Sequence, residues 1–369
     1  MLGWVGNRPG DRSRVESVDR NFRKAAGEAS LTAEKDGRTR VGVIGLGRLW
    51  ETRHKPALAR MSHRFEVTAV YDQVARRAAI EAGQLGCSAC DGLSALIHRD
   101  DVDVIQILAP QWFGGHAVEL ACAAGKPIYC ALPLAGDPDV LEALASLIES
   151  SGAVFMPELA RRFYPATLRL RELLATKLGA PRLILGQSLS KGFDRYGKPG
   201  PSTQLSPAPL LVDPGAYLID WCRHVFQDEP IAARGFSSRV NALEGDAADD
   251  PDFECFHLDF KAGQTAQISF GRHRQAPWGD PTRFMPPAGF QVFADRGAAW
   301  VEMPNHVVWA DSEGVHDEIL PQEPDVGEVL NDQFQRLVRG EASLAPGLKD
   351  LLAVSRLVKK LRAERLEKI

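Results

Sequence analysis

Apolar runs and helical periodicities alternate along the chain from Arg40 to about residue 157. The run from Val41 to Ile44 lacks helical spacing, which is typical of a buried strand, and a helical pattern follows it. A second apolar run ends at Asp72. The same alternation then predicts helices at 75–82, 93–97, 116–124 and 140–150 and strands at 102–108, 127–130 and 153–156. This order predicts an α/β fold with a parallel sheet covered by helices on both faces.

The pattern changes beyond residue 157. A helix is expected at 168–178, and the Gly-, Pro- and Ser-rich stretch 191–209 is expected to be a long loop. Short alternating segments follow at 232–240, 254–260, 265–269, 289–294, 298–302 and 306–309. These segments predict one large, open, mostly antiparallel sheet, and two helices at 329–338 and 348–366 close the chain.

A length of 369 residues suggests two domains. Residues 1–39 have little apolar periodicity and many charged residues, so a disordered extension is expected there. We expect a dinucleotide-binding domain at 40–157 and an α+β domain for substrate binding and oligomerisation at 158–369.

A glycine turn follows the first expected strand. Gly45 permits a tight turn, and Gly47 lets backbone N–H groups approach a pyrophosphate at the start of the next helix. Asp72 comes 27 residues after Gly45, where it can accept hydrogen bonds from ribose hydroxyls. Trp50 stands where a third glycine is usual, so the alternative is an ordinary strand–helix turn without a ligand.

Charge and cysteine usage narrow the class of protein. The net charge of -4 argues against a nucleic-acid partner. The sequence contains no run of about 18 apolar residues, so no membrane-spanning helix is expected. Six cysteines are scattered, and the Cys87–Cys90 pair lacks the second pair that a zinc ribbon needs, so no metal site is expected. Without a signal-peptide core, the reducing cytoplasm is the expected compartment.

Several motifs in the same order resemble the Gfo/Idh/MocA oxidoreductases from Arg40 to the C-terminus. They are V-G-V-I-G-L-G at 41–47, D-V-D-V-I-Q-I-L-A-P at 101–110, A-A-G-K-P-I-Y-C-A-L-P-L-A at 123–135, R-F-Y-P at 162–165 and D-P-G-A-Y-L-I-D at 213–220. The resemblance implies an N-terminal Rossmann domain, a C-terminal open sheet and hydride transfer between a nicotinamide and a sugar or cyclitol carbon. It also implies a homodimer or homotetramer formed through the C-terminal sheet.

The chain departs from the family at one motif. The resemblance assigns proton transfer to a Lys in E-K-P and to a His or Tyr in D-x-G-x-H/Y-x-x-D. Here the E-K-P positions hold Ala131, Leu132 and Pro133, so the Glu and the Lys are both missing. The family's usual His after Pro110 is replaced by Gly114, although His116 follows two residues on.

The second motif remains as a candidate catalytic stripe. Asp213, Tyr217, Asp220 and His224 have spacings that place them on one helical face, and such a polar stripe is costly to bury without a function. The alternative is that Asp213 caps the helix and Tyr217 only packs. Tyr217 is the candidate for proton transfer, and a nearby cation would have to lower its pKa from about 10.

Basic residues of the second domain are candidates for that cation and for substrate contacts. The candidates are Arg162, Lys191 and Arg195, with His224 as a further cation. The trio 272–274 near Trp278 is interpreted as a solvated loop, and it would favour an acidic substrate if it faced the cleft.

The resemblance and the glycine turn together give a set of coenzyme-binding candidates. They are Gly45, Leu46, Gly47, Arg48, Leu49, Asp72, Arg76, Ala109, Pro110, Leu132 and Pro133. Asp72 favours NAD, whereas Arg76 and Arg77 leave NADP open.

Three functions fit these observations. The first is an NAD(P)-dependent oxidoreductase acting on a small sugar-like substrate, with Tyr217 in place of the lysine. The second is a nucleotide-binding sensor or scaffold that has lost its chemistry. The third is a sugar-processing enzyme that recycles tightly bound NAD.

Overall fold

The computed structural model describes residues 37–109, 115–131, 138–191, 214–238, 253–273 and 289–363. Several sequence-based expectations fall outside these residues: those for 1–36, Pro110, Gly114, Leu132, Pro133, Arg195, Asp213, Arg274 and Trp278. The side chains of Lys191, Arg272 and His273 also lie outside the description.

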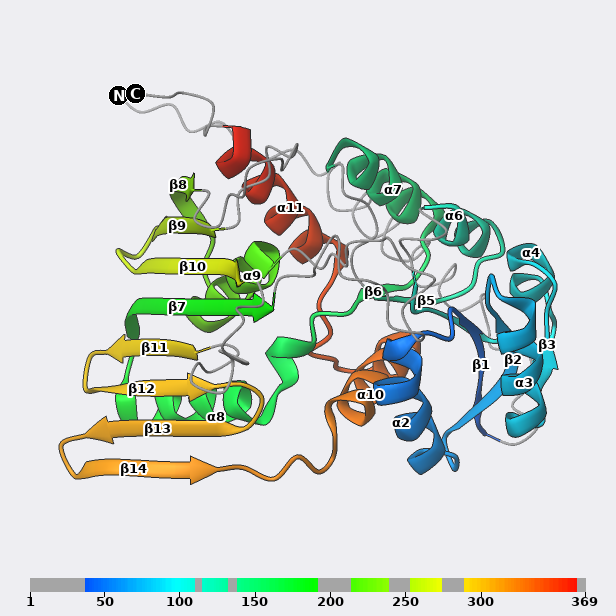
Figure 1. Ribbon diagram of the computed structural model, residues 1–369, viewed down its shortest axis with the longest axis horizontal. Coiled ribbons are helices and arrows are strands. Elements are labelled where there is room, and N and C mark those ends of the chain that lie inside the picture. Colours follow the sequence, from blue (N-terminus) through cyan, green and yellow to red (C-terminus); the bar gives the residue numbers. More distant parts are fainter. Residues whose placement is uncertain are drawn as a thin grey trace, which may run out of the picture.

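The first domain is built on a six-stranded sheet of order β3-β2-β1-β4-β5-β6 in which every pair is parallel. Its strands are β1 Thr39–Ile44, β2 Phe65–Tyr71, β3 Ser88–Ala89, β4 Val104–Ile107, β5 Ile128–Cys130 and β6 Phe155–Pro157. Strands β4, β5 and β6 are buried along their whole length, because helices cover both faces of the sheet. The expected parallel α/β domain is confirmed (Figure 1).

Two separate cores flank this sheet. The helices are η1 Trp50–His54, α2 Lys55–Arg60 and α3 Ala75–Leu85 on one face, and α4 Leu93–Ile97, α6 His116–Ala123 and α7 Pro138–Ser151 on the other. Gly125 follows α6 at φ +65°, as expected for a glycine that ends a helix. Trp50, in the place of the third glycine, is fully buried in a π-helical turn and donates its indole N–H to Glu81 at 3.1 Å.

The second domain is an eight-stranded sheet of order β14-β13-β12-β11-β7-β10-β9-β8. Its strands are β7 Pro181–Lys191, β8 Pro230–Ser238, β9 Phe253–Phe260, β10 Thr265–His273, β11 Gly289–Ala294, β12 Gly297–Glu302, β13 His306–Asp311 and β14 Gly314–Ile319. Only the β7–β10 pair is parallel, so the expectation of a mostly antiparallel sheet is confirmed. Helices α8 Pro165–Leu173, which continues into η3 Leu174–Leu178, and α9 Pro214–Phe226 pack on one face (Figure 1).

Three strands were not expected from the sequence: the two-residue β3 of the first sheet, and β7 and β14 of the second. Strand β7 lies in the middle of the sheet, yet its apolar run is short and Gly186 interrupts it. A Cβ at Gly186 would lie 2.9 Å from the Phe290 ring, so the close approach of the neighbouring strand requires this glycine. Strand β14 is an edge strand with mixed polarity, and its pattern therefore gave no signal.

The last two helices of the chain both contact the first domain, although they follow the strands of the second. Helix α10, Val326–Val338, starts with a capping box formed by Asp325 and Glu328. Its buried Leu330 and Phe334 join the core of the first domain rather than that of the second. Helix α11, Leu348–Ala363, packs between α7 and α9 and so touches both domains (Figure 1). None of the described helices is long and apolar enough to cross a membrane.

Candidate coenzyme and substrate site

The turn after β1 can accept only glycine at its first corner. Gly45 has φ +94°, and a Cβ there would lie 2.5 Å from the Cβ of Ala109 and 2.9 Å from the Ala109 nitrogen. Both the dihedral angle and the contact exclude a side chain. The Gly45 N–H donates to the Tyr71 carbonyl at 2.8 Å, which fixes the turn against the end of β2.

Gly47 lies in a different environment. A Cβ at Gly47 would meet no atom of the described residues within 4 Å, so the space above its backbone is open. Arg48 is exposed and Leu49 is half-buried beside it. The residues therefore fit a phosphate group that approaches the backbone at the start of the helical segment.

Asp72 ends β2 and ties the glycine turn to the next helix. Its carboxylate accepts hydrogen bonds from the backbone N–H groups of Leu46 and Val74, each at 2.9 Å. One Arg77 nitrogen lies 3.2 Å from both carboxylate oxygens. Asp72 is thus at the position expected for a ribose-binding acid, but Arg77 already covers part of it.

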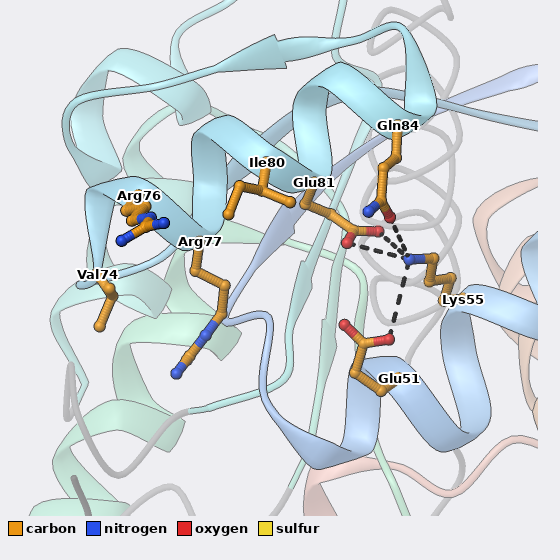
Figure 2. Close-up of a pocket in the computed structure, with 8 residues that line it drawn as sticks. All are labelled: Glu51, Lys55, Val74, Arg76, Arg77, Ile80, Glu81 and Gln84. Atoms are coloured by element: carbon orange, nitrogen blue, oxygen red, sulfur yellow. Dashed lines mark hydrogen bonds and ion pairs between the residues drawn. The ribbon is translucent and has the colours of Figure 1, made fainter. Parts of the chain in front are cut away.

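A surface pocket of about 410 Å³ opens beside this acid, between η1 and α3. Arg76 and Arg77, at the start of α3, line this pocket (Figure 2). The Lys55 ammonium contacts Glu51, Glu81 and Gln84 on its other side. Lys55 is therefore neutralised by its neighbours. Arg76 makes no ion pair with any residue that the structure describes.

The carboxyl end of β6 carries an acid that the sequence analysis did not single out. Glu158 is buried, and its carboxylate lies 3.0 Å from His54 Nε2, accepts the Tyr129 hydroxyl at 2.7 Å and is paired with Arg53. Burial works to raise the pKa of Glu158, but hydrogen bonding and charge from His54 and Arg53 outweigh it and lower the pKa to about 2. The signal in the sequence was an acid directly after a buried strand.

The polar stripe of α9 faces a row of arginines on η2, Ala160–Phe163, and α8. The Arg161 guanidinium lies 5.4 Å from the centre of the Tyr217 ring. Arg162 donates to Asp220 at 2.5 and 2.9 Å, and one nitrogen of Arg171 lies 3.5 Å from His224. Tyr217, Asp220 and His224 therefore share one side of the helix, and each has its own arginine.

Arg162 is already engaged inside the protein. It also donates to Asp350 at 2.8 Å, and although burial opposes it, these two acids raise the pKa of Arg162. Burial, followed by the charges of Arg162 and Arg171, lowers the pKa of His224 to about 3, so this imidazole is neutral. Neither residue is thus a free cation beside Tyr217.

The expectation that a neighbouring cation lowers the pKa of Tyr217 is wrong. Burial has the largest effect and raises this pKa, and the Glu158 charge raises it further. Arg161 and Arg53 act in the opposite direction but do not prevail. Tyr217 is therefore a protonated phenol at neutral pH.

Comparison with known proteins identifies the first domain. Residues 39–159 match the Gfo/Idh/MocA family described as "Oxidoreductase family, NAD-binding Rossmann fold". This first domain belongs to the Gfo/Idh/MocA oxidoreductase family. The glycine turn, the open space at Gly47 and the acid at the end of β2 accordingly belong to an NAD-binding Rossmann domain.

Several relatives of the chain are sugar or cyclitol dehydrogenases. It is 29% identical to D-xylose 1-dehydrogenase (NADP(+)) 2 of Haloferax volcanii, over 38% of this chain and 42% of that relative. It is 24% identical to inositol 2-dehydrogenase of Rhizobium meliloti, over 85% of this chain and 93% of that relative. The match to the xylose dehydrogenase thus spans about two fifths of its length.

The fold is shared with solved structures over most of the chain. An oxidoreductase from Agrobacterium radiobacter, crystallised with NAD+, L-tartaric acid and magnesium, superimposes with a TM-score of 0.72 at 18% identity. The match covers 88% of this chain and 96% of that one. Both domains therefore have the same architecture as that oxidoreductase.

Proposed function

We propose that this protein transfers hydride between NAD(P) and a carbon of a sugar- or cyclitol-like substrate that bears a hydroxyl or carbonyl group. One observation carries the proposal. Tyr217 of the second domain lies close enough to the first domain that the Glu158 charge raises the pKa of Tyr217, and Tyr217 in turn raises the pKa of Tyr129. The proposed proton-transfer residue therefore faces the carboxyl ends of β5 and β6, where open α/β sheets bind their ligands.

The first domain has the groups that would hold the coenzyme. The backbone at Gly47 and Arg48 would receive the pyrophosphate, and Asp72 would accept the adenosine ribose hydroxyls. Ala109 and Ala131, at the carboxyl ends of β4 and β5, would border the nicotinamide, which when bound supplies or accepts the hydride. The resemblance adds Pro110, Leu132 and Pro133 to this border.

We favour NAD over NADP. Asp72 is largely buried and negatively charged, so it repels a 2′-phosphate, and Arg77 is neutralised by it. Arg76 remains as the cation that could accept NADP.

Tyr217 acts best as a proton donor. Because its phenol stays protonated, it can give a proton to a carbonyl oxygen as hydride reaches the carbon, which favours the reductive direction. The Arg162–Asp220 pair, 58 residues apart, joins η2 to α9 and holds Tyr217 in place. We therefore propose Arg162 and Asp220 as positioning residues, with Asp213 kept as a candidate catalytic acid and His224 as a neutral neighbour.

The test is reduction of a panel of keto-sugars and keto-inositols with NADH or NADPH, followed by absorbance of the reduced coenzyme. The Tyr217→Phe variant should lose about 10²- to 10⁴-fold in kcat/KM, because it removes only the hydroxyl. Its Kd for the coenzyme should stay within about twofold, which controls for folding. Unchanged turnover in the variant would contradict the assignment.

The change at the E-K-P motif supports a second candidate. Ala131 stands where the family has its Glu, and this alanine is buried and bound to the Ile107 carbonyl through its N–H at 2.9 Å. A sensor or scaffold would bind coenzyme without turnover of any substrate. An enzyme that recycles NAD would instead purify with coenzyme and form no net reduced nicotinamide.

We also infer a homo-oligomer formed through the open face of the second sheet. Ala299 and Val301 of β12 face the buried core, so Trp300 points to the opposite side and is 50% exposed. Val315 and Ile319 of β14 are even more exposed and share this open side, because the intervening His316 and Glu318 contact Trp309 and Arg169. An exposed apolar face of this kind is typical of a subunit interface.

A further inference from the structure

Arg161, unlike the neighbouring Arg53 and Arg162, has no paired carboxylate among the described residues. Arg53 is paired with Glu158, and Arg162 is paired with Asp220 and Asp350. No acid lies within ion-pair distance of Arg161 among the residues that the structure describes. Its nitrogen Nη1 is buried and has no hydrogen-bond partner in the same described part of the chain.

An unpaired guanidinium in this position is costly. Burial lowers the pKa of Arg161. The Tyr164 and Tyr217 phenols oppose this effect, followed by the Asp220 carboxylate, which Arg162 already binds. Removing a charge from water without a partner is costly, and a ligand that supplies the opposite charge would offset this cost. The Tyr217 ring contacts one face of the guanidinium, and this contact leaves Nη1 without a hydrogen-bond partner among the described residues.

We propose that Arg161 binds a carboxylate of the substrate, so that the protein acts on a polyhydroxy acid and not on a neutral polyol. The inference rests on the proposed function, because it places this carboxylate beside the substrate carbon whose oxygen receives the proton of Tyr217. One uncompensated positive charge matches a singly charged carboxylate, and the planar guanidinium can bind both of its oxygens. A doubly charged phosphate would leave one negative charge unpaired there.

The experiment compares each acid with its neutral counterpart on the full-length protein. D-gluconate is paired with D-glucitol, D-glucuronate with D-glucose, and D-galactonate with galactitol, and D-glucose 6-phosphate is added as the phosphate probe. Binding is measured by calorimetry with and without saturating NAD. At least one carboxylate should bind tenfold or more tightly than its neutral counterpart, and more tightly than the phosphate.

Two variants locate the effect. Arg161→Met should abolish the preference, whereas Arg169→Met, which removes an arginine paired with Glu318, should keep it. The melting temperature is the second readout. Arg161→Met should melt above the wild type because it removes an uncompensated charge, and Arg169→Met should melt below it.

Three results would overturn the inference: equal or tighter binding of every neutral counterpart, a preference for the phosphate, or a carboxylate preference that survives Arg161→Met. None of these depends on turnover. If carboxylate binding follows Arg161 but no nicotinamide-linked turnover is found, the proposed oxidoreductase function fails and this site stands. If turnover is found with neutral substrates only, the proposed oxidoreductase function stands and the carboxylate site at Arg161 fails.

Discussion

At the scale of single residues, Glu158 shows burial and neighbouring groups acting in opposite directions. Burial favours the neutral acid, yet His54, Arg53 and Tyr129 hold the carboxylate charged and lower its pKa to about 2. Because the folded pKa lies below the ordinary value of 4.5, the stabilisation is complete above about pH 4.5. It is lost as the pH falls from there towards 2.

We predict that Glu158→Gln lowers the free energy of unfolding at pH 7 by on the order of 3 kcal/mol, because a pKa shift of this size is worth that much. The variant should also lose less stability than the wild type between pH 5 and 2. Urea unfolding at a series of pH values measures both effects. Glu142→Gln is the control, since Glu142 forms an exposed pair with Arg356 worth at most about 1 kcal/mol. An equal loss of unfolding free energy between pH 5 and 2 in the wild type and in Glu158→Gln would contradict this account.

At the scale of an element, the turn between β1 and η1 combines two glycines with different functions. Gly45 is required by its positive φ and by Ala109, so its importance is structural. Gly47 faces open space, so its importance lies in what approaches it. Replacing each glycine by alanine in turn therefore distinguishes the structural role of Gly45 from the binding role proposed for Gly47.

We predict that Gly45→Ala lowers the free energy of unfolding by about 2–4 kcal/mol, through backbone strain and the clash with Ala109. Gly47→Ala should change it by less than about 1 kcal/mol but weaken NAD(P) binding tenfold or more, because the methyl group occupies the open space. Thermal unfolding and coenzyme titration on both variants give the comparison. Full coenzyme affinity in Gly47→Ala would show that no phosphate approaches this backbone.

At the scale of the whole molecule, the second sheet has one packed face and one open face. Helices α8 and α9 cover the first, while exposed Trp300, Val315 and Ile319 lie on the second. This arrangement leaves apolar area that a second copy of the chain can cover.

We predict that Trp300→Glu weakens self-association by more than about 2 kcal/mol, because a central tryptophan is typical of residues that dominate an interface. Analytical ultracentrifugation over a concentration series measures the effect. Lys261→Glu, in the exposed turn between β9 and β10, changes the charge in the same direction and should leave assembly intact. A wild-type protein that stays monomeric at all concentrations would refute the proposed interface.

The sequence by itself determined the order of the first domain and the positions proposed for its coenzyme site. Gly45 and Gly125 act through local geometry, and the period of the apolar residues identifies the strands of this domain apart from the two-residue β3. The stripe of Tyr217, Asp220 and His224 on α9 is also local, since it depends only on helical spacing.

Only the tertiary structure decided which surfaces and charges meet. A helical pattern shows that one face is buried but not against which core, so the docking of α10 on the first domain could not be read from it. Strand β7 needed its neighbours to be recognised as the centre of the sheet. Arg162 finds its acids 58 and 188 residues away, whereas the adjacent Arg161 finds none among the described residues. Ion pairing depends on distances in space, and the order of residues along the chain does not contain those distances.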